Sequence, residues 1–82
     1  MVSACVLIRS RSGKFEDAVN TIEKIAHIDR VFPVLGRYDI VADVKAPNFK
    51  ELGSLILRLS KISGVVFTES LVEIQGQEDK KC

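Results

Sequence analysis

The spacing of Ser, Cys, His, Asp and Glu in this 82-residue chain pairs no nucleophile with a base. His27 is the single histidine, and its position at the end of a predicted helix favours an interaction with the helix C-terminus over a role as a base. Asp39 and Asp43 have the same strand parity and are expected on one sheet face, but they are too far apart to share a proton. We therefore predict no catalytic residue and no enzymatic activity.

Positive charge concentrates just before the first predicted helix, where Arg9, Arg11 and Lys14 lie close together. These side chains could hold an anion at the helix N-terminus. The segment contains one glycine, Gly13, and neither of the glycine-rich patterns that cradle a nucleotide phosphate. A solvated turn accounts for the same residues, and we favour that interpretation.

Composition excludes several kinds of site. The chain has one histidine and two cysteines, Cys5 and Cys82, near opposite ends, which predicts no metal site, no cofactor and no disulfide framework. Twelve Lys and Arg against eleven Asp and Glu give a net charge of +1, so no basic field favours direct binding of nucleic acid. Aromatic stacking of RNA is not expected either, because the first predicted strand carries no aromatic residue.

The chain has the composition of one soluble folded domain, with 46% hydrophobic and 28% charged residues. No segment predicts a membrane span. The apolar N-terminal stretch is too short for a secretory signal, so we expect cytoplasmic residence. Within that stretch Cys5 is expected to be a small buried side chain.

Apolar periodicity predicts six elements in the order βαββαβ. Near-continuous apolar residues predict a strand over 2–9, and apolar residues at helical spacing predict an amphipathic helix over 15–26. Two runs of β-forming residues, 28–35 and 38–45, flank Gly36 and predict a hairpin. The first run should be an edge strand, because Pro33 has no N–H to donate to a neighbouring strand. Asn48 and Glu51 predict a capped second helix that ends at Gly64, and the last strand runs over 65–74.

This order predicts an α+β, ferredoxin-like fold, with a four-stranded antiparallel sheet and both helices on one face. Residues 1–75 are assigned to this domain and residues 76–82 to a polar C-terminal tail. The first strand is apolar on both sides, since Cys5 and Leu7 point opposite to Val6 and Ile8. The uncovered face therefore predicts a homodimer that packs sheet against sheet.

The most informative segment is 34–41, Val-Leu-Gly-Arg-Tyr-Asp-Ile-Val. Local structure alone can explain it, because Gly36 permits a turn, Tyr38 begins a strand and Asp39 accepts nearby backbone N–H groups. The order of the whole chain adds a second interpretation. A G-x-Y-D hairpin, a capped helix ending in Ser63-Gly64, and then Thr68 and Ser70 alternating on the last strand resemble the effector-binding domain of Lrp/AsnC regulators.

The resemblance covers residues 2–74 and implies a domain that binds amino acids or similar metabolites between subunits, dimerises, and assembles into rings of dimers. Full-length relatives carry an N-terminal helix-turn-helix, whereas this sequence starts at the first strand, so the stand-alone form is expected, without direct DNA binding. Co-assembly with full-length regulators of this family is a further expectation. The resemblance places six residues at the effector site: Gly36, Arg37, Tyr38, Asp39, Thr68 and Ser70. In that site Asp39 would meet an amino group, and the two hydroxyls a carboxylate.

Two alternatives share the predicted strand order. A dimeric, cofactor-independent monooxygenase would need a polar activating group in a pocket of one subunit, and the lack of tryptophan and the single histidine count against it. An ACT-like regulatory domain would place its ligand turn after the first strand, at Gly13 rather than Gly36. That turn lacks the Asp and Pro usual in such domains, so we rank this alternative lower.

Overall fold

A computed structural model of the chain, which describes residues 1–73, contains the six predicted elements in the predicted order. The predicted domain end at residue 75 and the polar tail over 76–82 lie outside the described residues. The elements are β1 (Val2–Ser10), α1 (Phe15–Glu23), β2 (Ile28–Pro33), β3 (Ile40–Ala46), α2 (Phe49–Ser60) and β4 (Val65–Val72).

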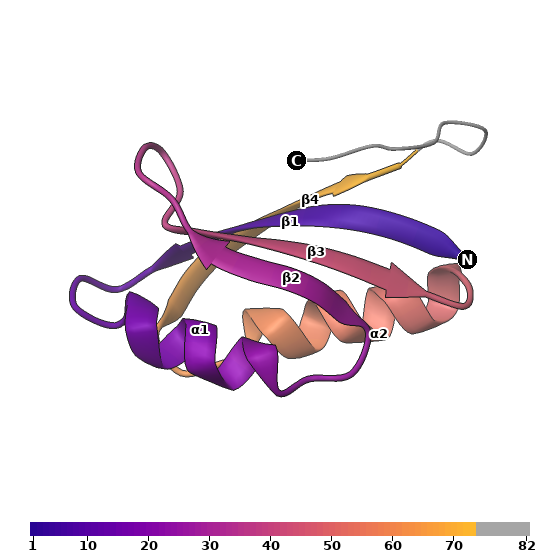
Figure 1. The fold of residues 1–82 in the computed structure, drawn as a ribbon, viewed down its shortest axis with the longest axis horizontal. Helices are drawn as coiled ribbons and strands as arrows, with labels where there is room; N and C mark the ends of the chain where they lie inside the picture. The colour runs from indigo at the N-terminus through magenta and orange to yellow at the C-terminus, as the bar shows by residue number, and fades with distance from the viewer. Residues whose placement is uncertain (74–82) are drawn as a thin grey trace.

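The strands form one antiparallel sheet in the order β2-β3-β1-β4, and both helices lie on the same side of it (Figure 1). This is the predicted ferredoxin-like arrangement. The strand that contains Pro33 is an edge strand, as its missing N–H requires. The connections β1–α1 and β2–β3 lie at the same end of the molecule, and the β2–β3 connection rises on the side away from the helices (Figure 1).

The core lies between the sheet and the helices and consists of aliphatic side chains. Central strand β1 contributes Val6 and Ile8, which are fully buried, and β3 contributes Ile40. The helices cover them with Ile22 from α1 and Leu59 from α2. Burying each such side chain contributes about 1.5–3 kcal/mol, so this layer supplies most of the favourable free energy of folding.

Within residues 1–73, no helix lies over the side chains on the opposite face of the sheet. We call this surface the open face. Cys5 is only half-buried there, so the prediction of a buried cysteine was wrong, because no helix of the fold covers this side of the sheet. The ladder registers assign the following residues to the open face: Ser3, Cys5, Leu7, Arg9, Arg30, Phe32, Val41, Asp43, Lys45, Phe67, Glu69 and Leu71.

Helix α2 starts where its predicted cap lies. The Asn48 side chain accepts a hydrogen bond from the Glu51 N–H at 2.9 Å, which satisfies one of the free donors of the first turn. Helix α1 has no side-chain cap at Lys14 and ends at Glu23 rather than at residue 26. The N–H of Ile25 bonds to the Ile22 carbonyl, three residues back, in a tighter turn that closes the helix early.

The hairpin differs from its prediction in its connection. Strand β2 ends at Pro33 and β3 begins at Ile40. The last two residues of the predicted strand 28–35 and the first two of the predicted strand 38–45 therefore belong to the connection. The Val34 N–H donates to the Asp39 carbonyl at 2.8 Å and closes a loop of six residues, 34–39. Gly36 lies at a φ of +140°, a conformation that glycine adopts without a steric cost.

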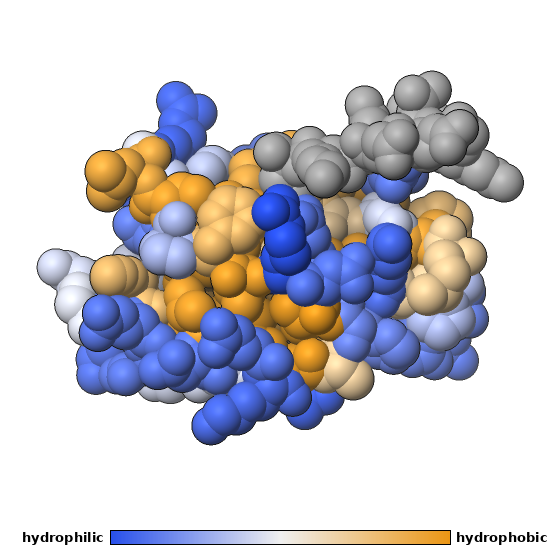
Figure 2. Space-filling view, in the orientation of Figure 1, coloured by the Kyte–Doolittle hydropathy of each residue, from blue (hydrophilic) through white to orange (hydrophobic). Residues whose placement is uncertain are grey.

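Figure 2 shows an apolar surface in the middle of one side of the molecule, with hydrophilic residues around it and over α1. Within residues 1–73, no helix is both long and apolar enough to cross a membrane.

Candidate functional site

Asp39 fastens the β2–β3 connection to the end of β1. Its Oδ2 atom accepts a hydrogen bond from the Ser10 N–H at 2.8 Å and lies 3.5 Å from the Ser10 hydroxyl. The Asp39 N–H in turn donates to the Ile8 carbonyl at 2.9 Å. The carboxylate thus extends the β1–β3 pairing beyond the last paired residues, Ile8 and Ile40. A structural role for Asp39 is therefore present before any ligand binds.

Tyr38 belongs to the β2–β3 connection and contacts the far edge strand, β4. Its hydroxyl donates a hydrogen bond to the carboxylate of Glu69 on β4. Its ring stacks on Phe67, with the ring centroids 6.5 Å apart and an interplanar angle of 17°. The hydrogen bond to Glu69 raises the pKa of Tyr38, because it favours the protonated phenol, and the nearby cations Arg37 and Arg9 oppose this shift.

Thr68 and Ser70 lie on the other side of β4 from these contacts. They pair with Ile8 and Val6 of β1, whose side chains face the helices. Successive residues of a strand point to opposite faces, so the two hydroxyl side chains point away from the open face that carries Phe67 and Glu69. Within one chain, the predicted effector set is therefore divided between two faces of the sheet.

A groove of about 530 Å³ separates the β1–α1 and β2–β3 connections. We call it the loop groove. Of the six predicted effector residues, only Asp39 lines it. Sequence analysis considered Arg11 and Gly13 only as parts of the turn before the first helix, because no local pattern predicts that this turn meets the β2–β3 connection. The lining residues are Ser10, Arg11, Ser12, Gly13, Phe15, Pro33, Val34, Leu35 and Asp39.

The Gly13 turn and the Gly36 turn, which distinguished two of the sequence-based hypotheses, lie at the same end of the molecule (Figure 1). Gly13 lines the loop groove, as does Leu35, the neighbour of Gly36. A ligand found near Gly13 or near Gly36 would therefore not by itself distinguish the Lrp/AsnC-type site from the ACT-like site. Arg11, flagged for its charge, is in the groove wall, whereas Arg9 and Lys14 are outside it.

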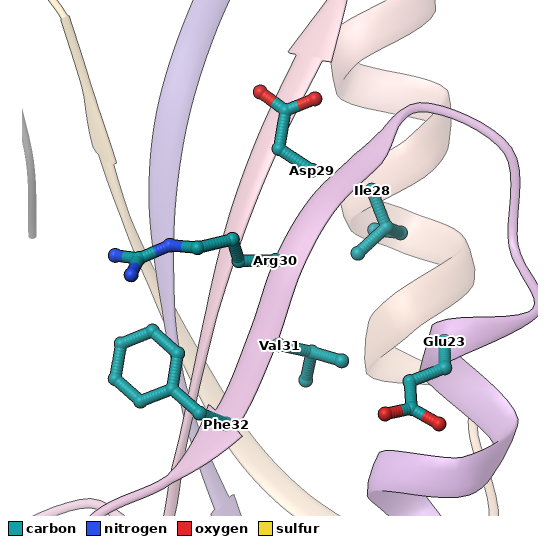
Figure 3. A pocket seen from close by; sticks show the side chains of 6 residues that line it. All are labelled: Glu23, Ile28, Asp29, Arg30, Val31 and Phe32. Carbon is teal, nitrogen blue, oxygen red and sulfur yellow. The ribbon is translucent and has the colours of Figure 1, made fainter.

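A second hollow, of about 440 Å³, follows the edge strand β2 (Figure 3). Ile28 and Val31 project from one side of the strand, toward the side from which Glu23 of α1 comes, and Arg30 and Phe32 project from the other. Two of the three charged residues that line this hollow, Asp29 and Arg30, already have partners, and Asp29 lies 3.7 Å from the Lys45 ammonium group. The Arg30 guanidinium lies 2.9 Å from Asp43 and 4.8 Å from the centroid of the Phe32 ring. This surface offers a ligand fewer unused groups than the loop groove.

Metal-binding chemistry finds no support in the described part of the chain. No group of three or more His, Cys, Asp or Glu side chains that could hold a metal ion occurs among residues 1–73. Near the β2–β3 connection, the structure shows hydrogen bonds of Asp39 and Tyr38 and a ring contact with Phe67.

Comparison with known proteins gives a family match over most of the chain. The model of the Lrp/AsnC ligand binding domain matches residues 3–76. The HTH-type transcriptional regulator FL11 of Pyrococcus abyssi is 26% identical over 76 residues, and that of Pyrococcus furiosus is 26% identical over 78 residues. These matches cover 93% and 95% of this chain but only 50% and 52% of the regulators. The chain spans about half the length of the curated relatives it matches.

Solved structures show the same fold. The protein TTHA0845 from Thermus thermophilus superposes with a TM-score of 0.88 at 29% identity, over 94% of this chain and 98% of that one. AsnC of E. coli gives a TM-score of 0.84 at 19% identity, over 99% of this chain and 56% of that one. The regulator NMB0573 of Neisseria meningitidis, solved as a complex with L-Met, gives 0.83 at 19% identity, over 98% and 53%.

Proposed function

Because this chain belongs to the Lrp/AsnC ligand-binding domain family, we propose that it is a regulatory domain that binds an amino acid or a similarly small metabolite and self-associates through its open face. The role proposed is regulatory rather than catalytic. The observation that carries the proposal is the open face itself, an apolar sheet surface beside the G-x-Y-D connection that no helix in residues 1–73 covers.

Large apolar side chains are exposed on this face. Phe67 is 54% exposed and Leu71 is 53% exposed, and both belong to the edge strand β4. An exposed apolar strand at a sheet edge favours association with another chain. Two charged groups on this face already have partners, since Arg30 pairs with Asp43 and Glu69 accepts a hydrogen bond from Tyr38. A second copy that covers them would leave neither without a partner.

The effector side of the proposal rests on the β2–β3 connection. Tyr38 contacts Phe67 on the open face, so a subunit packed there would lie against the connection that the family resemblance assigns to the ligand. Thr68 and Ser70 face the other way and would reach the same effector only from a neighbouring subunit. A structural relative solved with L-methionine makes free amino acids the first ligand class to test.

The finer expectations form part of the same proposal. Dimers would assemble into rings, co-assemble with full-length regulators of the family in the cytoplasm, and leave contact with DNA to those partners. A weakly charged surface, with a net charge of +1, supports the last point.

The test of self-association compares two leucines of similar exposure. Leu71→Arg places a charge on the open face, while Leu57→Arg places the same charge on the outer side of α2, where Leu57 is 62% exposed. We expect Leu71→Arg to yield monomers in sedimentation experiments and Leu57→Arg to keep the wild-type mass, because a buried unpaired charge opposes association. Equal masses for the wild type and both variants would contradict an interface on the open face.

The test of effector binding is thermal unfolding of the chain with each free amino acid at millimolar concentration. A ligand that binds only the native state raises the midpoint by mass action. We expect a selective rise with a subset of amino acids. No rise with any of them, repeated by calorimetric titration, would overturn the proposal that this domain binds amino acids.

A further inference from the structure

Cys5 is disulfide-bonded, and its half-buried side chain belongs to the open face. It lies on β1, an inner strand of the sheet, and pairs with Asp43 on β3 and with Leu71 on β4. Cys5 is the only cysteine among residues 1–73, so the sulfur to which it is bonded lies outside the described residues. The sequence contains one other cysteine, Cys82, which is its last residue.

The chain leaves the sheet close to Cys5. Strand β4 is the neighbour of β1 and ends at Val72, and the Glu73 N–H donates to the Ser3 carbonyl at 2.9 Å. Ser3 precedes Cys5 by two residues on β1. A rise of about 3.4 Å per residue and a spacing of about 4.8 Å between strands place Glu73 within about 10 Å of Cys5. The two cysteines are near opposite ends of the sequence, and sheet pairing brings the start of the C-terminal segment to Cys5.

Nine residues, 74–82, follow Glu73. Fully extended, they would span about 30 Å, so the segment is long enough to turn back and cross β4 to reach Cys5. Gly76 is near its start, and glycine adopts the conformations of tight turns without a steric cost. A short tether gives the Cys82 thiol an effective concentration at Cys5 of about a millimolar or more. This favours a bond within one chain over a bond between two copies.

We propose that Cys5 and Cys82 form a disulfide within one chain, and that this bond holds residues 74–82 across the open face, where they exclude a second copy. Packed sheets lie about 10 Å apart, and the side chains of the two facing surfaces fill this distance. A further segment of main chain over an inner strand therefore has no room inside such an interface. Reduction of the bond releases the segment and makes the open face accessible.

The inference rests on the proposed function, because it assumes self-association through the open face, and it adds redox control of that association. Cytoplasmic thiols are kept reduced by glutathione, and disulfides formed there are mostly transient and redox-sensing. The proposed cytoplasmic location therefore favours a bond that forms and breaks with the glutathione balance over a permanent one.

The oxidant for this bond is oxidised glutathione, which reacts with the two cysteines by thiol–disulfide exchange. One cysteine thiolate attacks the glutathione disulfide and releases one glutathione thiolate. The second cysteine thiolate attacks the mixed disulfide, forms the bond between Cys5 and Cys82, and releases the other glutathione thiolate. The two protons lost by the cysteines pass to the released thiolates, so the chain loses two electrons and glutathione gains them.

The first experiment identifies the bond. The full chain is incubated with oxidised glutathione or with dithiothreitol, its thiols are blocked with iodoacetamide under denaturing conditions, and a glutamate-specific protease cleaves it. Cys5 is then on the peptide 1–16 and Cys82 on the peptide 79–82. We expect mass spectrometry to find these two peptides joined in the oxidised sample and both cysteines alkylated in the reduced one. A disulfide-linked dimer on a non-reducing gel, or alkylated Cys82 in the oxidised sample, would overturn the bond within one chain.

The second experiment measures the mass of oxidised and reduced protein by sedimentation over a range of concentrations. We expect the dissociation constant of the wild-type dimer to be at least about tenfold higher after oxidation. Cys82→Ser cannot form the bond, so it should dimerise equally in both conditions. The matched control Lys81→Ser changes the neighbouring residue, keeps both cysteines and should behave as the wild type. Circular dichroism checks that each variant is folded.

The outcomes distinguish this inference from the proposed function. If the oxidised wild type contains the bond and dimerises as tightly as the reduced protein, the segment does not exclude a second copy and the redox control is wrong. If the reduced wild type and Cys82→Ser stay monomeric at every concentration, the proposed self-association fails, and the redox control fails with it. Peptide mapping decides in that case whether the bond between Cys5 and Cys82 is correct.

Discussion

The two faces of the sheet are built from the same strands and differ in what covers them. On the helix side, Val6 and Ile8 of β1 have no exposed surface. On the open face, Leu7, which lies between them in sequence, is half-buried, and Phe67 and Leu71 of β4 are more than half exposed. Successive residues of β1 point to opposite faces of the sheet and are apolar on both. The chain therefore provides apolar side chains for two layers, and α1 and α2 cover only one of them.

The difference teaches how folding and association are divided in this domain. The helix-covered face holds side chains that only the chain's own fold can bury, and its contribution does not depend on protein concentration. The open face holds apolar area that only association with a second copy would bury. It also carries the ion pair Arg30–Asp43 and the hydrogen bond Tyr38–Glu69. The following measurements test this division.

The largest expected effect comes from neighbouring residues on opposite faces of β1. Ile8→Ala should lower the free energy of unfolding by about 2–5 kcal/mol at every protein concentration, because it leaves a cavity in the core. Leu7→Ala should cost much less in dilute protein and more in concentrated protein, since part of its burial comes from a second copy. Denaturant unfolding across a range of concentrations measures both. A concentration-independent loss of equal size at the two positions would contradict the division.

A smaller effect is expected from the ion pair on the open face. In protein dilute enough to be monomeric, Arg30→Gln removes the contact to Asp43, but the Arg30 side chain is 54% exposed, so the loss in the free energy of unfolding should be at most about 1 kcal/mol. Screening by salt should reduce it further. Denaturant unfolding at low and high salt measures the loss. A loss above about 2 kcal/mol that salt does not change would show that a neighbouring copy buries this pair.

The smallest effect concerns Tyr38, the single tyrosine of the chain, whose ultraviolet titration is therefore unambiguous. Its pKa should exceed the ordinary 10.0, and Glu69→Gln should lower the pKa toward that value, because the carboxylate that favours the protonated phenol is lost. A raised pKa means that the folded state holds the proton more tightly. The associated stability is then present below pH 10 and lost as the pH rises through the raised pKa. If the pKa of Tyr38 is the same in Glu69→Gln as in the wild type, the hydrogen bond between Tyr38 and Glu69 does not form in solution.

Local patterns predicted much of the fold. The Asn48 cap and the edge position of the strand with Pro33 depend on residues close together in the sequence, and the structure confirms them. Element ends were less accurate. The early end of α1 at Glu23 and the six-residue connection 34–39 follow from hydrogen bonds that compete with continued helix or strand, such as that from Val34 to Asp39.

Sequence by itself determined the order of the elements and the alternation of side chains, because both arise from local backbone geometry and the periodicities of helix and strand. Tertiary structure alone decided which groups meet. Asp39 and Ser10 are 29 residues apart, and Tyr38 and Glu69 are 31 apart. The loop groove joins the connection that follows β1 to the connection that precedes β3, its antiparallel partner. Such contacts depend on sheet order and register, which bring distant residues together through the burial of one shared core.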